Sequence, residues 1–405
     1  MPELRVKPST PLNCASFLLH LQMPLNYSGI VWDSVGSRSI LIDTPDREVV
    51  PMAREKFCVG LDIGTSGVKL CLLRRKKEQI VLDTYGYVPL PPSTIVDGAL
   101  MNPSRIVDAI KELLATHKVR HKEVAFAVSG HYVIIKKISL PEMTRAELES
   151  SITWEAEQFI PFDIADVNID VQVLQQQSAQ QGQMDVVLVA AKKDFIDEYT
   201  SVVTEAGLEP MVCDVDAFAI ENMFLQNYEA SPSETVALVN VGASKTNINI
   251  LARGQSTFTR DLSVGGNNFT EEIQKQLGVS AEEAEALKLG GRAEPGSASD
   301  AVVPQEVQRS LQVVSDNVAT ELQRSLDFYA ATSADVQPSQ IYLMGGSAQL
   351  HVLEQTIKSR VGVPVTVVDP FRRINTDALD PNYIATHAAT ASVAVGLALR
   401  YPGDN

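Results

Sequence analysis

Several familiar signatures are missing from this 405-residue chain. No apolar run approaches the roughly 20 residues of a transmembrane helix. Basic residues are few, 34 Lys and Arg against 50 Asp and Glu, and the resulting net charge of −16 argues against nucleic acid and against direct binding to an anionic membrane. The sequence thus predicts neither a nucleic-acid partner nor direct membrane insertion.

Cysteines are also scarce, and they lack the spacing of metal ligands. A pair between Cys58 and Cys71 across a hairpin is one interpretation. Free buried thiols in a reducing compartment are the interpretation we favour. The four positions are Cys14, Cys58, Cys71 and Cys213.

The two commonest nucleotide-binding loops are absent too. The stretch 242–246 lacks the upstream glycine of a Walker A loop, and no G-x-G-x-x-G follows a strand. What the chain does have is 45% hydrophobic residues with a mean hydropathy near zero, which is typical of sizeable cores. A chain of this length predicts about two to three domains, and we interpret it as a soluble cytoplasmic protein of two.

Residues 1–51 differ from the rest in composition. They contain prolines at 2, 8, 11, 24, 45 and 51 and show no sustained helical or strand period. We interpret them as a disordered extension, or as a mis-assigned start with Met52 as the true initiator; a short docking tail is the alternative. Folded structure is expected to begin within 52–57.

A strand–turn–strand pattern over 59–73 is the most informative stretch. Its turn reads Asp-x-Gly-Thr-Ser-Gly, in which glycines let backbone N–H groups approach an anion and hydroxyls add donors. The turn residues are Gly64, Thr65, Ser66 and Gly67. Asp62 places a carboxylate where a phosphate-bound Mg²⁺ would sit. An ordinary hairpin is the alternative, because such turns are common.

A second hairpin over 235–251 has a similar small-residue turn, and a later strand ends in a double glycine before a helix. The second turn contains Asn240, Gly242, Ala243 and Ser244, and the late turn contains Gly345, Gly346 and Ser347. Two such hairpins from the two halves of a chain predict a nucleotide held in a cleft between duplicated domains.

These motifs resemble those of the actin-like ATPase superfamily. The resemblance implies an α/β fold of two duplicated RNase H-like lobes, with ATP and Mg²⁺ between them. It also implies that Lys69 contacts the β-phosphate, the alternative being a solvent-facing strand residue. The superfamily has aspartate where this chain has Asn240, and neutral Asn is poorer at holding Mg²⁺ and polarising water. We therefore expect ATP binding with weak or absent hydrolysis, the nucleotide being mainly a structural or switch ligand.

Three further superfamily elements can be matched by the same resemblance. Asp216 matches the water-orienting residue of the first connecting helix, and a helix N-cap is the alternative. Gly265 and Gly266 resemble the glycine pair that leads into the second lobe. Glu285 and Lys288 resemble the residues that contact ribose and base, although an i,i+3 pair is often a solvated face.

A compact module is expected between the two hairpins. Thr144 and Glu147 form a capping box that opens a helix, which places Leu148, Ile152 and Phe159 on one face and stops at Pro161. Strands are predicted over 166–174 and 185–191, and a helix over 194–206.

The run Trp-Glu-Ala-Glu-Gln-x-Ile-Pro-Phe over 154–162 resembles the PilM family of type IV pilus assembly and is similar to the inserted subdomain of FtsA. A helical core stripe is the alternative interpretation. The PilM resemblance implies binding of the cytoplasmic N-terminal peptide of the inner-membrane protein PilN. It also implies an indirect association with PilO and the pilus motor proteins, at the cytoplasmic face of the inner membrane. An FtsA-like filament protein is the second candidate, although the ending 401–405 leaves no room for its membrane-targeting helix.

The predicted organisation follows from these positions. A helix over 391–400 resembles the second connecting helix, where Gly396 would permit a close crossing at a pivot or simply tight packing. The expected units are a first lobe over 52–137 and 207–234, an inserted peptide-binding subdomain over 138–206, and a second lobe over 235–400.

Overall fold

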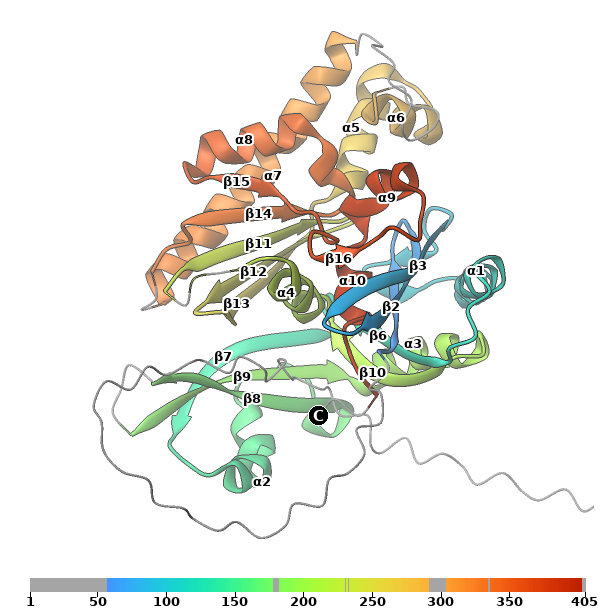
Figure 1. The fold of residues 1–405 in the computed structure, drawn as a ribbon. Coiled ribbons are helices and arrows are strands. Elements are labelled where there is room, and N and C mark those ends of the chain that lie inside the picture. The colour runs from blue at the N-terminus through green and yellow to red at the C-terminus, as the bar shows by residue number, and fades with distance from the viewer. Residues whose placement is uncertain are drawn as a thin grey trace, which may run out of the picture.

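The computed structural model describes residues 57–177, 182–229, 231, 233–290, 304–333 and 336–402. The predictions for residues 1–51 lie outside these ranges. Figure 1 shows two α/β units, one above the other, with a third small sheet below them. Within the described ranges, no helix combines the length and apolar character needed to cross a membrane.

The first lobe is built on a six-stranded sheet in the order β10-β6-β1-β2-β3-β16. Its core lies between this sheet and the helices α1 (Pro103–Thr116) and α3 (Lys193–Glu205). The short strands β4 (Ile95–Val96) and β5 (Ala99–Leu100) pair with each other beside it. The sheet strands are β1 (Val59–Gly64), β2 (Gly67–Lys76), β3 (Gln79–Pro89), β6 (Glu123–Val128), β10 (Glu209–Val215) and β16 (Ile374–Asn375).

The second lobe has a five-stranded sheet in the order β13-β12-β11-β14-β15. Its strands are β11 (Thr235–Val241), β12 (Thr246–Ala252), β13 (Gln255–Leu262), β14 (Gln340–Met344) and β15 (Val365–Val367). The helices of this lobe are α5 (Gly266–Leu277), α6 (Ala281–Lys288), α7 (Gln305–Thr332) and α8 (His351–Val361), with the 3₁₀ turn η3 (Gly346–Gln349). The later elements α9 (Pro381–His387) and η4 (Ala388–Thr390) lie against β3 of the first lobe, where Tyr383 and Thr390 contact Tyr85.

The two sheets repeat one topology. In each, three antiparallel strands (β1-β2-β3 and β11-β12-β13) are followed by two parallel ones (β6, β10 and β14, β15), which add on the other side of the first strand. The parallel strands follow crossover connections, as parallel pairing requires. The predicted duplicated α/β fold is therefore confirmed.

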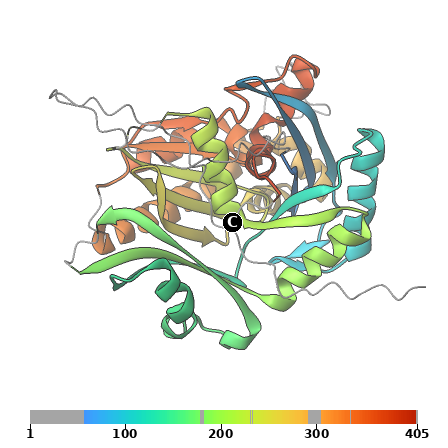
Figure 2. The same cartoon turned by 60° about the horizontal axis from the view of Figure 1, so that its bottom comes forward.

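A third sheet, in the order β7-β9-β8, is inserted between β6 and β10. Its strands are β7 (Val133–Pro141), β8 (Val167–Gln177) and β9 (Gln183–Lys192), joined by α2 (Arg145–Ala156) and the turn η2 (Ile164–Asp166). Turning the molecule shows α2 on the side of this sheet that faces away from the lobes (Figure 2). Apolar residues of α2 and of the sheet form its own core.

The capping box of α2 is confirmed, since Glu147 N–H donates to Thr144 Oγ1 and the Glu147 carboxylate accepts from Thr144 N–H. The helix ends at Ala156, however, and not at Pro161. The N–H groups of Phe159 and Ile160 both donate to the Ala156 carbonyl, so a turn replaces the last helical residues. The prediction that placed Phe159 on the helix was wrong.

Helix α3 packs with the first lobe and also touches the inserted sheet, because Val187, Val189 and Ala191 of β9 belong to the same core. Its apolar residues Phe195, Tyr199 and Val203 share the core of Val59 and Leu61. The inserted sheet itself runs from Val133 to Lys192. The boundaries of the module predicted over 138–206 stay a prediction, and its first strand begins at Val133.

The two lobes are joined by α4 (Asp216–Asn227) and α10 (Ser392–Leu397), which cross at very short range. A Cβ atom built on Gly396 would lie 1.7 Å from the Ala219 carbonyl oxygen, and one on Gly60 would lie 2.1 Å from the Ala394 oxygen. The predicted close crossing is present, while its use as a pivot stays a prediction. Beside it Arg400 and Asp214 form a buried ion pair of 2.7 Å.

Three of the cysteines can be placed in the structure. Cys58, Cys71 and Cys213 are all buried, and Cys71 faces Gly60 across the first hairpin. The prediction of free thiols is confirmed for Cys71 and Cys213, and Cys14 lies outside the described residues.

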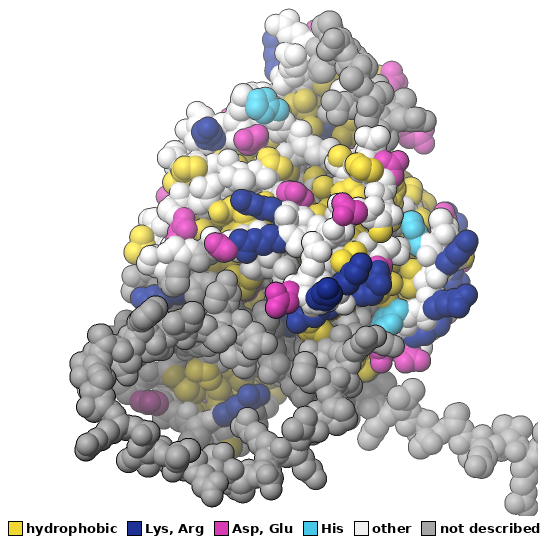
Figure 3. All heavy atoms as spheres, viewed as in Figure 1, with side chains coloured by type: hydrophobic (Ala, Val, Ile, Leu, Met, Phe, Trp, Pro, Cys, Tyr) yellow, Lys and Arg dark blue, Asp and Glu magenta, His cyan; other side chains and the backbone are white. Residues whose placement is uncertain are grey.

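The charged surface is mixed on the face seen in Figure 1. Acidic and basic side chains alternate over both lobes (Figure 3). Basic side chains gather near the outer end of β2 and β3, where Arg74, Arg75 and Lys76 are exposed. The excess of acidic residues therefore does not form a single patch on this face.

Candidate functional site

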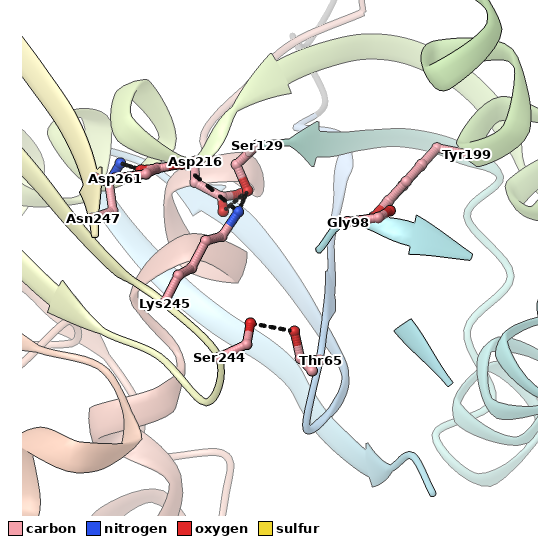
Figure 4. Close-up of polar contacts among 9 residues, drawn as sticks. All are labelled: Thr65, Gly98, Ser129, Tyr199, Asp216, Ser244, Lys245, Asn247 and Asp261. Atoms are coloured by element: carbon pink, nitrogen blue, oxygen red, sulfur yellow. Dashed lines mark hydrogen bonds and ion pairs between the residues drawn. The ribbon is translucent and has the colours of Figure 1, made fainter. Parts of the chain in front are cut away.

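The tips of the two predicted hairpins touch each other. Thr65, in the turn between β1 and β2, and Ser244, in the turn between β11 and β12, form a hydrogen bond of 2.9 Å between their side-chain oxygens. Figure 4 shows this contact beside a second cluster that joins the lobes. The hairpins therefore face one another across the boundary between the lobes, as the sequence predicts.

The first hairpin carries a buried ammonium group. Lys69 lies directly opposite Asp62 in the strand register, and its Nζ is 3.1 Å from Asp62 Oδ2. A Cβ atom on Gly64 would come within 2.8 Å of the same Nζ, so the charge lies at the turn. With 7% of its surface exposed, Lys69 is not the solvent-facing residue of the alternative interpretation.

The same geometry tests whether the residues fit Mg²⁺. In nucleotide sites, Mg²⁺ keeps several waters and is held by one or two carboxylates plus phosphate oxygens. Lys69 engages Oδ2 of Asp62, which leaves Oδ1 for a hydrated ion. Asn240 adds no charge. Among the described residues, no group of three or more His, Cys, Asp or Glu could hold a metal by itself. Asp62 is thus suited to contact a Mg²⁺ ion whose other ligands are mainly phosphate oxygens and water.

The glycines predicted for the second lobe come together. Gly266 N–H donates to the Gly242 carbonyl at 2.8 Å, and the next residue's N–H donates to the Ala243 carbonyl at 2.7 Å. A Cβ on Gly265 would lie 2.8 Å from both of these carbonyl oxygens. Gly265 is therefore needed for the close approach of α5 to the second hairpin.

The late glycine turn lies against the same hairpin. Gly345 has a φ of +90°, and a Cβ there would meet the Val241 carbonyl oxygen at 2.4 Å and Asn240 Oδ1 at 2.5 Å. Only glycine fits at position 345, because a side chain would strain this backbone conformation and would collide with these two oxygen atoms. Ser347 Oγ lies 2.9 Å from the Cβ position of Gly266. The turn 345–347 and the start of α5 thus form one surface around the second hairpin.

Glu285 and Lys288 also join this surface. They form an ion pair of 2.6 Å, and Lys288 Nζ donates to the Gly266 carbonyl at 3.3 Å. Thr270 of α5 donates to Glu285 at 2.5 Å. The Lys288 side chain is 9% exposed and that of Glu285 is 47% exposed. The pair is therefore anchored beside Gly266 and is more than a solvated helix face.

Asp216 is not a helix cap. Val215 is the N-cap of α4 and makes no side-chain cap bond. The carboxylate of Asp216 instead accepts a hydrogen bond of 2.5 Å from Ser129 Oγ, and Lys245 Nζ donates to the same Oγ at 2.5 Å. Burial raises the pKa of Asp216, and Lys245 partly opposes this. The N-cap interpretation is wrong, while the water-orienting role stays a prediction.

Sequence reasoning missed three members of this cluster, which Figure 4 draws: Ser129, Lys245 and Asp261. Lys245 lies 3.9 Å from Asp261 Oδ2, and Asn247 donates to Asp261 at 2.7 Å. One signal was available, because Ser129 and Asp216 each follow a strand, and carboxyl ends of parallel strands meet at one edge of a sheet. No local sequence pattern indicated which lysine would reach Ser129 and Asp216.

The aromatic residues around the end of α2 divide into two groups. Phe159 packs against the core of the inserted sheet, with Lys136 Nζ 5.0 Å from its ring centroid, and Phe162 has Lys192 Nζ at 4.7 Å. Trp154 is 76% exposed. Phe159 and Phe162 therefore pack against the core from outside the helix, and the interpretation of Trp154 as part of a core stripe is wrong.

The duplicated lobes and the hairpins that meet between them define a protein with the actin-like ATPase fold. A family model described as "Type IV pilus assembly protein PilM" matches residues 60–401. The chain therefore belongs to the PilM family, as the motif over 154–162 predicts.

Two relatives support this placement. A solved structure of a PilM–PilN type IV pilus biogenesis complex matches with a TM-score of 0.74 and 28% identity, covering 85% of this chain and 98% of that one. The cell division protein FtsA of Streptococcus pneumoniae is 24% identical in an alignment of 357 positions that covers 79% of this chain and 77% of the relative. The predicted likeness to both families is confirmed.

Proposed function

We propose that this chain is the cytoplasmic actin-like component of type IV pilus assembly and that it binds the cytoplasmic N-terminal peptide of PilN. The observation that carries this proposal is its likeness, over 85% of its length, to the structure of a PilM–PilN complex. PilN would hold the chain at the inner membrane. Indirect association with PilO and the pilus motor proteins stays a prediction.

The cleft between the hairpins is proposed to hold ATP. Its phosphates would lie at the two turns, where Thr65, Ser66 and Ser244 offer hydroxyl donors and Lys69 offers a buried positive charge. The ribose and base would lie near Glu285 and Lys288. Charge-assisted hydrogen bonds of this kind are the stronger ones in protein sites.

Magnesium would accompany the nucleotide and reduce the charge repulsion among its phosphates. Asp62 would contact the hydrated ion through Oδ1. Because Asn240 supplies no carboxylate, the nucleotide is proposed to act mainly as a structural or switch ligand. It can shift the closure of the lobes only as far as it binds the two arrangements with different affinities.

The peptide is proposed to bind at the inserted sheet. In the order β7-β9-β8, the two outer strands β7 and β8 each leave one edge. An extended peptide can pair with such an edge through its backbone while its apolar side chains occupy neighbouring pockets. Trp154 lies exposed on α2, which packs beside β8. Large exposed aromatic side chains are common anchors in interfaces.

Calorimetric titration of the full chain with the N-terminal peptide of PilN from the same genome tests this proposal. One-to-one binding is expected, and the titration is repeated with Mg-ATP to measure any coupling between the two sites. A peptide of the same composition in scrambled order is the control. Equal heats from the two peptides, or none from either, would contradict the proposal.

An FtsA-like filament protein is the second candidate function, favoured by the match to FtsA in an alignment of 357 positions. Sedimentation of the chain with Mg-ATP, Mg-ADP and no nucleotide distinguishes the two. Nucleotide-dependent filaments without peptide binding would favour the FtsA-like function.

A further inference from the structure

A serine at the boundary between the lobes is placed as a nucleophile. Ser129 Oγ donates a hydrogen bond of 2.5 Å to Asp216 Oδ2 and accepts one of 2.5 Å from Lys245 Nζ. A hydroxyl within hydrogen-bond reach of a carboxylate base, with a cation beside it, is the arrangement of an activated nucleophile. The three groups come from the end of β6, the start of α4 and the turn of the second hairpin, as Figure 4 shows.

This cluster adjoins the proposed phosphate site. Lys245 follows Ser244, whose Oγ lies 2.9 Å from Thr65 Oγ1 at the meeting point of the hairpins. Lys245 Nζ is also 3.6 Å from the Cβ position of Gly130, beside Ser129. Burial is the main cause that raises the pKa of Asp216, and the charge of Asp62, in β1 of the first hairpin, raises it further.

We propose that Ser129 is an intramolecular phosphoryl acceptor, so that the chain phosphorylates itself with the nucleoside triphosphate bound between the hairpins. The inference rests on the proposed nucleotide site. It deepens that proposal by naming the group that receives the phosphoryl group in place of water.

The step balances without any further reagent. Ser129 Oγ attacks the γ-phosphorus as its proton passes to the Asp216 carboxylate. The bond between the γ-phosphorus and the β,γ-bridging oxygen breaks, and the nucleoside diphosphate leaves. Lys245 turns from the hydroxyl to the phosphoryl oxygens, where charge is greatest in phosphoryl transfer. Burial favours this role of Asp216, because it makes the carboxylate a stronger base.

The product would tie the lobes together. Phosphoserine carries close to two negative charges at neutral pH and three strong acceptor oxygens. Lys245, from the second lobe, already contacts this position on the first lobe. An ion pair between them would replace a contact in which only the ammonium is charged with one in which both partners are charged. Phosphorylation at Ser129 is thus expected to favour the closed arrangement of the lobes.

The chain contains a matched control. In the inserted sheet, Ser139 Oγ donates to Asp185 Oδ1 at 2.6 Å, and Lys137 Nζ lies 3.1 Å from Asp185 Oδ2. This trio has the same three residue types, but it belongs to β7 and β9 and not to the hairpins. A serine that is phosphorylated merely because it contacts an aspartate would be modified at both places.

The test is incubation of the purified full chain with Mg-ATP, followed by intact mass and peptide mapping, with nucleotide binding measured separately by calorimetry. One phosphoryl group on Ser129 is expected, absent in Ser129→Ala and unchanged in Ser139→Ala. Ser129→Thr should restore modification at the same position, which separates loss of the hydroxyl from loss of folding. Asp216→Asn should slow the reaction by about 10²-fold or more, the usual contribution of a positioned base.

Three outcomes would overturn the inference. If the nucleotide binds and Ser129 stays unmodified, the acceptor role fails while the proposed nucleotide site survives. Phosphate on Ser139 would show that the reaction is not specific to the proposed site. Modification of Ser129 in Asp216→Asn at the rate of the parent chain would show that Asp216 is not the base. If no nucleotide binds in any variant, the inference and the proposed nucleotide site fail together.

Discussion

Thr65 and Ser244 are 179 residues apart in the chain, and their side-chain oxygens lie 2.9 Å from each other. Each is a hydroxyl residue in the turn of a hairpin in its own lobe. The contact therefore joins the turns of two hairpins that have the same place in the two lobes. Anything that enters between the lobes at this point must be bound by both hairpins or must separate them.

Nucleotide affinity should depend on Lys69. Lys69→Met removes the buried ammonium that lies beneath the first turn, and we expect at least about a tenfold loss of ATP affinity, because a charged hydrogen bond contributes about 1.5–3 kcal/mol. Calorimetry or fluorescence titration measures it. Lys76→Met, at the exposed end of the same strand, is the control. Equal affinities for the two variants would rule out the phosphate contact.

Hydrolysis should respond to Asn240. Asn240→Asp restores a carboxylate at the end of β11 with almost no change in shape, and we expect ATP hydrolysis to rise, on the order of 10²-fold if the group acts as a positioned base. Phosphate release by purified protein measures the rate. A parent chain that hydrolyses ATP faster than the variant would contradict the proposed structural or switch role of the nucleotide.

The crossing of α4 and α10 should tolerate no side chain at Gly396. A Cβ there would lie 1.7 Å from the Ala219 carbonyl oxygen, so the helices must move apart. Gly396→Ala is expected to lower the free energy of unfolding by about 3 kcal/mol. Gly346→Ala is the control, because its new Cβ would meet only Thr390 Cγ2, at 3.5 Å. Denaturant unfolding of both variants decides whether the crossing is as tight as described.

Stability should fall as pH rises, owing to Glu221. This residue of α4 is 3% exposed, and burial raises the pKa of its carboxyl from 4.5 to about 8. Between these values the folded chain holds a proton that the unfolded chain has lost, so the free energy of unfolding decreases by about 1.4 kcal/mol per pH unit. The stabilisation is complete below the unfolded pKa and is lost as pH rises through about 8.

Glu221→Gln tests this dependence, since it keeps the shape and removes the titration. The free energy of unfolding, measured with denaturant between the two pKa values of Glu221, should depend less steeply on pH in the variant than in the parent chain. If the two slopes are the same, another group is responsible.

Peptide binding should depend on Trp154. Because this side chain is 76% exposed, Trp154→Ala should leave the free energy of unfolding within about 0.5 kcal/mol of the parent. We expect the affinity for the PilN peptide to fall about tenfold or more, as at other aromatic anchors. Phe328→Ala is the control, because Phe328 is 53% exposed on α7 of the second lobe. Equal peptide affinity for both variants would place the peptide elsewhere.

The hairpins could be predicted because their signals are local. Apolar strands flank a glycine turn, so the register that sets Lys69 opposite Asp62 follows from a short stretch of chain. Repetition of the pattern then indicated duplication. The capping box of α2 was equally local, whereas the early end of that helix depends on packing of Phe159 against the inserted sheet.

The cluster around Asp216 could not be predicted in the same way. Ser129 is 87 residues from Asp216 and 116 from Lys245, and no short-range pattern links them. Their meeting depends on how the second lobe is set against the first. A single sequence indicates which residues have the chemistry for a role, but not which of them converge across an interface between lobes.

The pairing of Arg400 with Asp214, and of β16 with β3, has a consequence for synthesis of the chain. The amide of Cys58, just before the first strand, donates to the Arg400 carbonyl at 2.7 Å, and β16 supplies the outermost strand of the first sheet from residues 374–375. A nascent chain with only its N-terminal half made still lacks this strand and the helix that covers Gly60. The first lobe can therefore be completed only after all strands of the second sheet have been synthesised.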